Sequence, residues 1–185
     1  MASQKNKITI PTHLTFLRMA LAVIFMMLIM IPAKWVKALA LMVFLIAAVT
    51  DKLDGYIARE TKTVTELGTF LDPIADKMLT NLAFLALVAL GVVPVWVFAM
   101  ILVRDFAVDG LRMVSIKKGK DLPSSLLGKS KTTVQMIALG VLLFSVVVNF
   151  DIVRIIGNIL LYAALIMTVT SGVGYFYNAR QKHII

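Results

Sequence analysis

Three long stretches without a charged residue limit what this chain can fold into. They run through residues 78–103, 132–150 and 155–179. A helix that crosses the hydrocarbon core of a bilayer needs about 20 mostly apolar residues, and each stretch provides them. Over the whole chain 60% of residues are hydrophobic and 16% are charged, whereas soluble domains carry about a quarter charged residues. The sequence therefore predicts an all-α protein that crosses a membrane several times.

Turn residues divide the apolar sequence into six predicted spans. The segment GVVPVW, Gly91 to Trp96, splits the first of the three stretches. The spans that flank residues 60–67 are apolar over only part of their length, so we expect helices that extend past the bilayer on one side. The predicted spans are 13–32, 35–59, 68–91, 94–117, 129–149 and 153–179. They form one domain, 13–185.

Residues 1–12 form a separate polar segment. They lack the apolar core and the cleavage site of a signal peptide. We expect this segment to lie on the membrane surface as a short helix, with Ile8 and Ile10 against lipid and Lys5 and Lys7 among the head groups.

Lysine and arginine residues predict which side of the membrane each loop occupies. With six spans, both termini share one side, and most of the basic loop residues fall there. Only Lys34, Lys37 and Arg154 fall on the other side. We therefore expect a multi-pass plasma-membrane protein with cytoplasmic termini. The net charge of +9 fits an anionic leaflet. Basic residues spread over several loops argue against nucleic-acid binding, and the lack of cysteine excludes disulfides and thiolate chemistry.

Four aspartates stand where the second and third predicted helices leave the membrane, in the stretch TDKLDGYIARETKTVTELGTFLDPIADKM. Positions i, i+3, i+4 and i+7 share one face of a helix, so carboxylates and small residues form one stripe on each helix. The first stripe holds Asp51, Asp54, Gly55 and Ala58, and the second holds Gly68, Asp72 and Asp76. The short linker predicts antiparallel neighbours, so both stripes are expected to meet at the cytoplasmic mouth.

Carboxylates that converge in this way repel one another and need a cation. Mg²⁺ suits an all-oxygen site, and it binds through a few carboxylates together with substrate phosphates. Two such ions can stabilise the attacking and leaving oxygens of a displacement at phosphorus. A single aspartate near a helix end is more often a cap or half of a surface ion pair. Ionisable residues within membrane spans, however, usually mark function.

The same residues resemble the signature of the CDP-alcohol phosphotransferase family, D-x2-D-G-x2-A-R-x8-G-x3-D-x3-D. Every fixed position is present here, as Asp51, Asp54, Gly55, Ala58, Arg59, Gly68, Asp72 and Asp76. Members of that family are six-spanning membrane enzymes. They join an alcohol to the phosphorus of a CDP-linked compound and release CMP.

The resemblance implies a role for each position. Asp51, Asp54 and Asp72 would be ligands of a divalent metal pair, Mg²⁺ or Mn²⁺, and Asp76 would be both a ligand and the general base. The CDP-lipid would be bound by Gly55, Ala58, Arg59, Gly68 and Thr15. The resemblance also implies a homodimer.

Thr15 belongs to a second matching segment, IPTHLTFLR, at the start of the first helix. It resembles the Pro-Asn-x-x-Thr-x-x-Arg segment of one bacterial branch of the family, with Thr12 in place of the asparagine. The alternative for these residues is a helix cap followed by Arg18 snorkelling to the interface.

Basic residues near the cytoplasmic ends of the fourth and fifth spans indicate what the acceptor carries. Arg112 shares a helix face with Asp105 and Asp109, and two lysines open the next helix, where an anion site is favoured. Metal ions would already screen the CDP phosphates, so surplus cations predict an acceptor with its own phosphate. Its candidate ligands are Arg112, Lys129, Lys131 and Arg104. An internal Asp109–Arg112 ion pair and membrane anchoring by the lysines remain alternatives.

The segments RDFAVDGLR and GKSKTTVQ resemble R-E-F-A-V-T-G-L-R and G-K-x-K-T-x-x-Q in the bacterial branch whose acceptor is glycerol 3-phosphate. Asp105 replaces the glutamate and keeps its charge. Asp109 replaces the threonine and adds a charge near the proposed phosphate site. The resemblance implies transfer of the phosphatidyl group of CDP-diacylglycerol to glycerol 3-phosphate, at an active site that faces the cytoplasm.

Three alternatives remain open at this stage. The first is another acceptor within the family, namely inositol phosphate, phosphatidylglycerol or serine. The second is a divalent-cation transporter, although transporters usually place their ion sites near the midplane of the bilayer. The third is an inactive relative that serves as an assembly partner.

Overall fold

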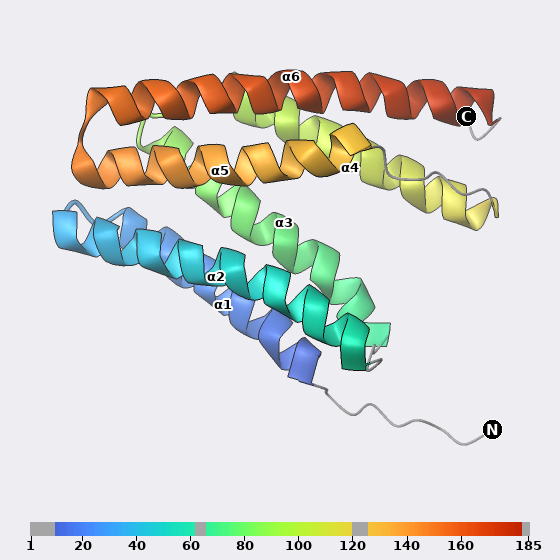
Figure 1. Cartoon of the computed structure of the whole chain (residues 1–185), viewed down its shortest axis with the longest axis horizontal. Coiled ribbons are helices and arrows are strands. Elements are labelled where there is room, and N and C mark those ends of the chain that lie inside the picture. Colours follow the sequence, from blue (N-terminus) through green and yellow to red (C-terminus); the bar gives the residue numbers. More distant parts are fainter. Residues whose placement is uncertain (1–9, 62–65, 120–125, 183–185) are drawn as a thin grey trace. The chain divides into compact units, whose positions relative to one another are not determined.

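The computed structural model describes residues 10–61, 66–119 and 126–182, and it leaves out some side chains in these ranges, notably those of residues 51–61 and 66–73. The described residues form six α-helices and no strand (Figure 1). The helices are α1 (Ile10–Ile29), α2 (Lys34–Thr61), α3 (Glu66–Ala89), α4 (Val95–Lys117), α5 (Leu126–Val148) and α6 (Asp151–Gln181). Each predicted span corresponds to one helix, with ends that agree within three residues.

The helices gather in two compact units, Met1–Ala86 and Leu87–Ile185. A single domain over 13–185 stays a prediction. Of the segment 1–12 that was expected to lie on the membrane surface, residues 1–9 lie outside the described residues, and Ile10 begins α1.

In the first unit, α1 and α2 run in opposite directions and pack along their length (Figure 1). The rings of Phe25 and Phe44 meet at the centre of this contact, with centroids 5.5 Å apart and planes inclined by 47°. The buried residues recur every three or four positions on both helices, as an apolar stripe requires. They are Ala22, Phe25 and Ile29 on α1, and Val36, Ala40, Phe44 and Ala47 on α2.

In the second unit, α6 packs against both α4 and α5. Small residues allow helices in a membrane to approach closely. Gly157 on α6 is one of these, because a Cβ added there would lie 2.6 Å from Cδ2 of Leu142 on α5. Leu142 is itself fully buried. The contact between α5 and α6 therefore depends on a position without a side chain.

Gly157→Ala is expected to lower the stability of the protein by about 1–3 kcal/mol, the usual cost of overpacking. The added methyl group would overlap the side chain of Leu142. Leu142 is fully buried, so its side chain cannot move into solvent to make room. Gly174→Ala is the matched control on the same helix, because a Cβ there meets nothing within 4 Å. Thermal unfolding in detergent measures the difference. Equal melting temperatures for the two variants would contradict the close approach of α5 and α6.

Two tight turns set the ends of the helices in this unit. Gly91 has a φ of 68°, which only glycine adopts without cost, and it ends the turn after α3. Arg154 on α6 donates through its NH2 group to the carbonyl oxygen of Gly91, at 3.2 Å. Asn149, with a φ of 54°, turns the chain between α5 and α6. The predicted GVVPVW turn is confirmed by the break between α3 and α4.

The surface of the described helices is strongly apolar. Among the described residues, the helices Ser130–Val148 and Asp151–Gln181 are long and apolar enough to cross a membrane. Thr15–Ile29 and Lys77–Ala89 form shorter apolar stretches. Large apolar side chains such as Met27, Val173 and Ile166 are about two-thirds exposed, as expected for a surface in contact with lipid. Six spans and cytoplasmic termini stay predictions.

Candidate active site

The aspartate motif lies on two continuous helices of the first unit. Asp51 and Asp54 belong to α2, and Asp72 and Asp76 belong to α3, so the spacing that places each pair on one helix face is confirmed for the backbone. Their side chains lie outside the described residues. The proposed metal site and the meeting of the two stripes therefore remain predictions.

The positions of the motif continue the buried faces of their helices. On α2, steps of three or four residues lead from Ala40, Phe44 and Ala47, all buried, to positions 51, 54 and 58. On α3, positions 72 and 76 are followed at the same steps by Leu79, Ala83 and Ala86, which are also buried. The motif positions are thus in helical register with the buried residues of α2 and α3.

A buried arginine lies at the level of the motif in the first unit. Arg18 on α1 is 3% exposed and Thr15 is 1% exposed. The antiparallel register that pairs Phe25 with Phe44 places position 18 level with position 51, and position 15 level with position 54. Burial by protein speaks against Arg18 snorkelling to the interface. Arg18 is therefore a candidate counter-charge for the motif that the sequence analysis did not assign.

Arg18→Met is expected to destabilise the protein by about 3–5 kcal/mol, the usual effect of removing one partner from a buried ion pair. The melting temperature of this variant should then respond more strongly to Mg²⁺ than that of the wild type, because a cation would replace the lost charge. Arg180→Met, at an exposed position of α6, is the control. Thermal unfolding with and without Mg²⁺ tests both statements. An unchanged melting temperature in Arg18→Met would exclude a buried counter-charge.

In the second unit, Asp105 joins two of the predicted phosphate ligands. Its Oδ1 accepts hydrogen bonds from NH1 of Arg104, at 3.0 Å, and from Nζ of Lys131. The other amino group of Arg104 donates to Oγ of Ser171 on α6, at 2.7 Å. Lys131 is 5% exposed. Two cations therefore converge on one partly buried carboxylate, where an anionic ligand would find both of them close together.

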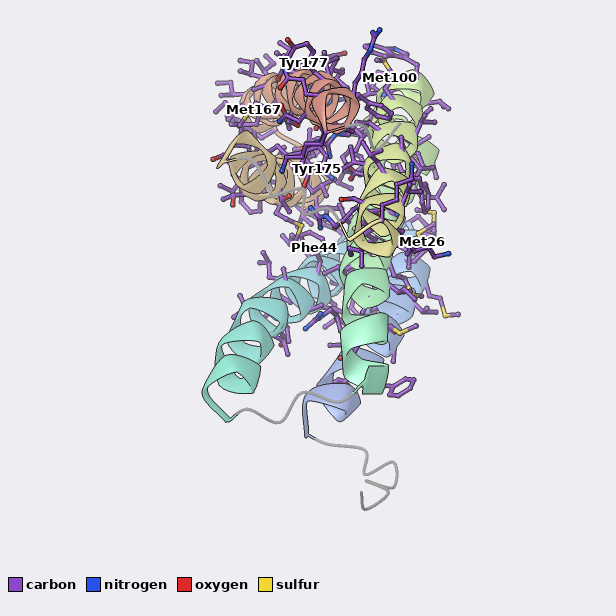
Figure 2. All side chains as sticks on the ribbon, turned by 90° about the vertical axis from the view of Figure 1, so that its right-hand side faces the viewer. Met26, Phe44, Met100, Met167, Tyr175 and Tyr177 are labelled. Atoms are coloured by element: carbon purple, nitrogen blue, oxygen red, sulfur yellow. The ribbon has the colours of Figure 1, made fainter. Side chains whose placement is uncertain are left out.

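Arg112 lies further along α4 and contacts α6. Its NH2 group donates to the hydroxyl of Tyr175 at 3.2 Å, and its guanidinium lies 6.0 Å from the centre of that ring. Tyr175 is buried on the inner side of α6, whereas Tyr177 lies on the outer side (Figure 2). The side chain of Lys129 lies outside the described residues. The structure thus brings Arg104 and Lys131 together and holds Arg112 against the next turn of α6.

Several residues of this cluster were missed by the sequence analysis. Ser171 and Tyr175 stand one turn apart in the uncharged stretch 155–179, and this polar spacing is the signal that the sequence offers. The sequence predicted a negative charge at Asp105 but not its ion pair with Lys131, which links α4 to α5. Gln135 ends the segment GKSKTTVQ, for which the sequence predicted no role at this position, and it is 3% exposed.

A groove of about 800 Å³ runs between α4 and α6 on the outer side of the second unit. Met100 and Val103 form one wall, and Val173 and Phe176 form the other. Figure 2 shows Met100 and Tyr177 on this side of the molecule. Arg104 reaches the groove from the cluster described above. Its apolar walls suit hydrocarbon chains, as expected for a surface in contact with lipid.

Comparison with known proteins gives consistent matches over most of the chain. The model of a family described as CDP-alcohol phosphatidyltransferase matches residues 8–170. A CDP-diacylglycerol–glycerol-3-phosphate 3-phosphatidyltransferase of Bacillus subtilis (strain 168) is 38% identical over 180 residues, which cover 90% of this chain and 93% of that protein. Proteins with the same name from Sodalis glossinidius and Pectobacterium atrosepticum are 38% and 39% identical, and cover 95% and 93% of this chain and 97% and 95% of their own lengths.

Proposed function

Because this chain belongs to the CDP-alcohol phosphatidyltransferase family, we propose that it transfers the phosphatidyl group of CDP-diacylglycerol to glycerol 3-phosphate. The products are phosphatidylglycerophosphate and CMP. Relatives that cover nearly the whole chain carry the name of this reaction. The observation that supports the choice of acceptor is the pair of cations Arg104 and Lys131, which are held together on the carboxylate of Asp105.

The proposed donor set fits a hard divalent cation, since it consists of four carboxylates at helical spacing on α2 and α3. Asp51, Asp54, Asp72 and Asp76 would hold Mg²⁺ or Mn²⁺, with two ions in the proposed site. Bound metal would supply positive charge to the phosphate oxygens of the CDP group. Gly55, Ala58, Arg59, Gly68 and Thr15 are proposed to line the pocket for that group.

The chemical step needs a base and an oriented hydroxyl. Asp76 takes the proton from the primary hydroxyl of glycerol 3-phosphate. The resulting oxygen forms a bond to the phosphorus that bears the diacylglycerol, and the bond from this phosphorus to the oxygen of the CMP phosphate breaks. CMP leaves with the electron pair of that bond. Groups fixed in advance around the phosphorus lower the barrier, because they need not reorganise as charge develops.

The phosphate of the acceptor binds in the second unit. Lys131 and Arg104 are fixed by Asp105, and Arg104 is also held by Ser171, so both cations are oriented before the ligand arrives. Arg112 and Lys129 complete the proposed phosphate site. An acceptor without phosphate, such as serine, would make no use of these cations.

The setting of the reaction follows from its substrates. CDP-diacylglycerol arrives from the leaflet with its acyl chains in lipid, and glycerol 3-phosphate enters from the cytoplasm. We propose a multi-pass protein of the plasma membrane whose active site faces the cytoplasm. We also propose a homodimer, following the family.

Release of CMP by the purified protein tests the proposal. The assay contains CDP-diacylglycerol, Mg²⁺ or Mn²⁺, and one acceptor at a time from a panel of glycerol 3-phosphate, inositol phosphate, phosphatidylglycerol and serine. Release that requires both metal and glycerol 3-phosphate is the expected result. Release with serine, which carries no phosphate, would overturn the assignment of the cationic cluster, whereas release with inositol phosphate would change only the identity of the acceptor. Metal flux into liposomes without CMP release would favour a transporter instead.

A further inference from the structure

The side chain of Gln135 on α5 is buried and has no hydrogen-bond partner among the residues that the structure describes. It is 3% exposed, and its Oε1 atom is both inaccessible and unpaired. A buried amide that loses its contacts with water and gains no other partner destabilises the folded state. Nearly all buried polar groups in proteins are therefore paired, and an exception of this kind needs an explanation.

Buried hydroxyl groups of the same unit are paired. The hydroxyl of Thr168 donates to the carbonyl oxygen of Ala164 at 2.6 Å, and that of Ser145 donates to Leu142 at 2.7 Å. Ser171 donates to the carbonyl of Thr168 at 3.1 Å and accepts from Arg104. These hydroxyl groups are paired within the unit, whereas Oε1 of Gln135 has no donor among the residues that the structure describes.

Gln135 lies beside the proposed phosphate site. It follows Lys131 by one helical turn, and side chains at i and i+4 are neighbours on a helix, with Cβ atoms about 5–6 Å apart. Lys131 is fixed by Asp105, so a phosphate bound there has a defined position. A carbon chain that extended from this phosphate along α5 would reach the next turn of the helix, where Gln135 lies. Glycerol 3-phosphate carries a secondary hydroxyl on the second carbon of this chain.

We propose that the side-chain carbonyl of Gln135 accepts a hydrogen bond from the secondary hydroxyl of glycerol 3-phosphate. Gln135 is then a residue that determines acceptor specificity, because it reads a group that takes no part in bond formation. The contact orients the glycerol chain and leaves the primary hydroxyl free to react. This inference rests on the proposed function and adds to it the recognition of one hydroxyl.

Comparison of two acceptors isolates this contact. The second acceptor is 3-hydroxypropyl phosphate, which has the phosphate and the primary hydroxyl but lacks the secondary one. In the wild type, kcat/KM for glycerol 3-phosphate should exceed that for the analogue by about tenfold, as expected for one hydrogen bond. In Gln135→Leu this ratio should fall to about one. The KM for CDP-diacylglycerol should not change.

Two further measurements separate recognition from a structural role. Gln135→Glu keeps an acceptor oxygen, so it should keep the ratio between the two acceptors even if its charge weakens the binding of both phosphates. Gln135→Leu should melt at or above the temperature of the wild type, because it removes an unpaired buried amide. A structural role for the amide would instead lower the melting temperature and leave the ratio unchanged.

The proposal fails if Gln135→Leu keeps the ratio of the wild type, which would mean that a buried water pairs with the amide. It also fails if the wild type uses both acceptors equally well. Absence of turnover with glycerol 3-phosphate in the wild type would overturn the proposed function itself. Turnover by the wild type is measured first, so failure of the proposed function is distinguished from failure of the proposed role of Gln135.

Discussion

Asp76→Asn is expected to slow CMP release by at least about a hundredfold, while the protein stays folded and binds CDP-diacylglycerol. Asparagine has nearly the shape of aspartate, but it cannot accept the proton of the attacking hydroxyl. Position 76 continues a stripe of α3 that is buried at Leu79 and Ala83, so the loss of charge there should not destabilise the helix. Steady-state release of CMP with saturating substrates measures the effect.

A metal titration separates the two roles proposed for Asp76. If it served only as a ligand, the variant would bind metal more weakly, and high Mg²⁺ would restore the rate. Loss of the base cannot be restored in this way. Asp109→Asn on α4 is the control for removal of a carboxylate outside the motif, and it should remain active. Recovery of Asp76→Asn at high Mg²⁺ to within a few-fold of the wild type would reject the assignment of the general base.

The six helices were predictable because long apolar runs leave the backbone only one way to satisfy its hydrogen bonds in lipid. The ends were less certain, and α2 and α3 extend further into the polar linker than the sequence indicated. The helical spacing of the motif was predictable in the same way, because Asp51 and Asp54 lie within one continuous helix, α2. These features depend on local sequence alone.

Contacts between helices were not predictable, and the cationic cluster shows why. Lys131 and Asp105 belong to different helices, and their pairing depends on how α4 and α5 pack in the second unit. In an apolar helix, residues that face lipid and residues that face protein are equally hydrophobic, so periodicity no longer identifies the buried face. The burial of Gln135 and Arg18 could therefore be seen only in the structure.

Lys131→Met is expected to raise the KM for glycerol 3-phosphate by about 10- to 100-fold, the usual contribution of a hydrogen bond to a charged group. The KM for CDP-diacylglycerol should stay near its original value. Arg104 still pairs with Asp105 in this variant, so the carboxylate is not left alone. Lys117→Met, at an exposed position of α4, is the matched control and should leave both KM values unchanged.

Replacing Asp105 together with Lys131 tests whether Lys131 binds the acceptor phosphate or only neutralises Asp105. If the lysine serves only to neutralise Asp105, then the double variant Lys131→Met with Asp105→Asn removes both charges and should recover the KM of the wild type. If the ammonium group binds the acceptor phosphate, the double variant lacks that cation and its KM stays high. Asp105→Asn alone should then weaken acceptor binding less than Lys131→Met, because it disturbs the position of two cations and removes neither. If the KM of the double variant returned to that of the wild type, Lys131 would not bind the acceptor phosphate. Removing Asp105 cannot supply a cation to hold that phosphate, so the phosphate would have to bind elsewhere.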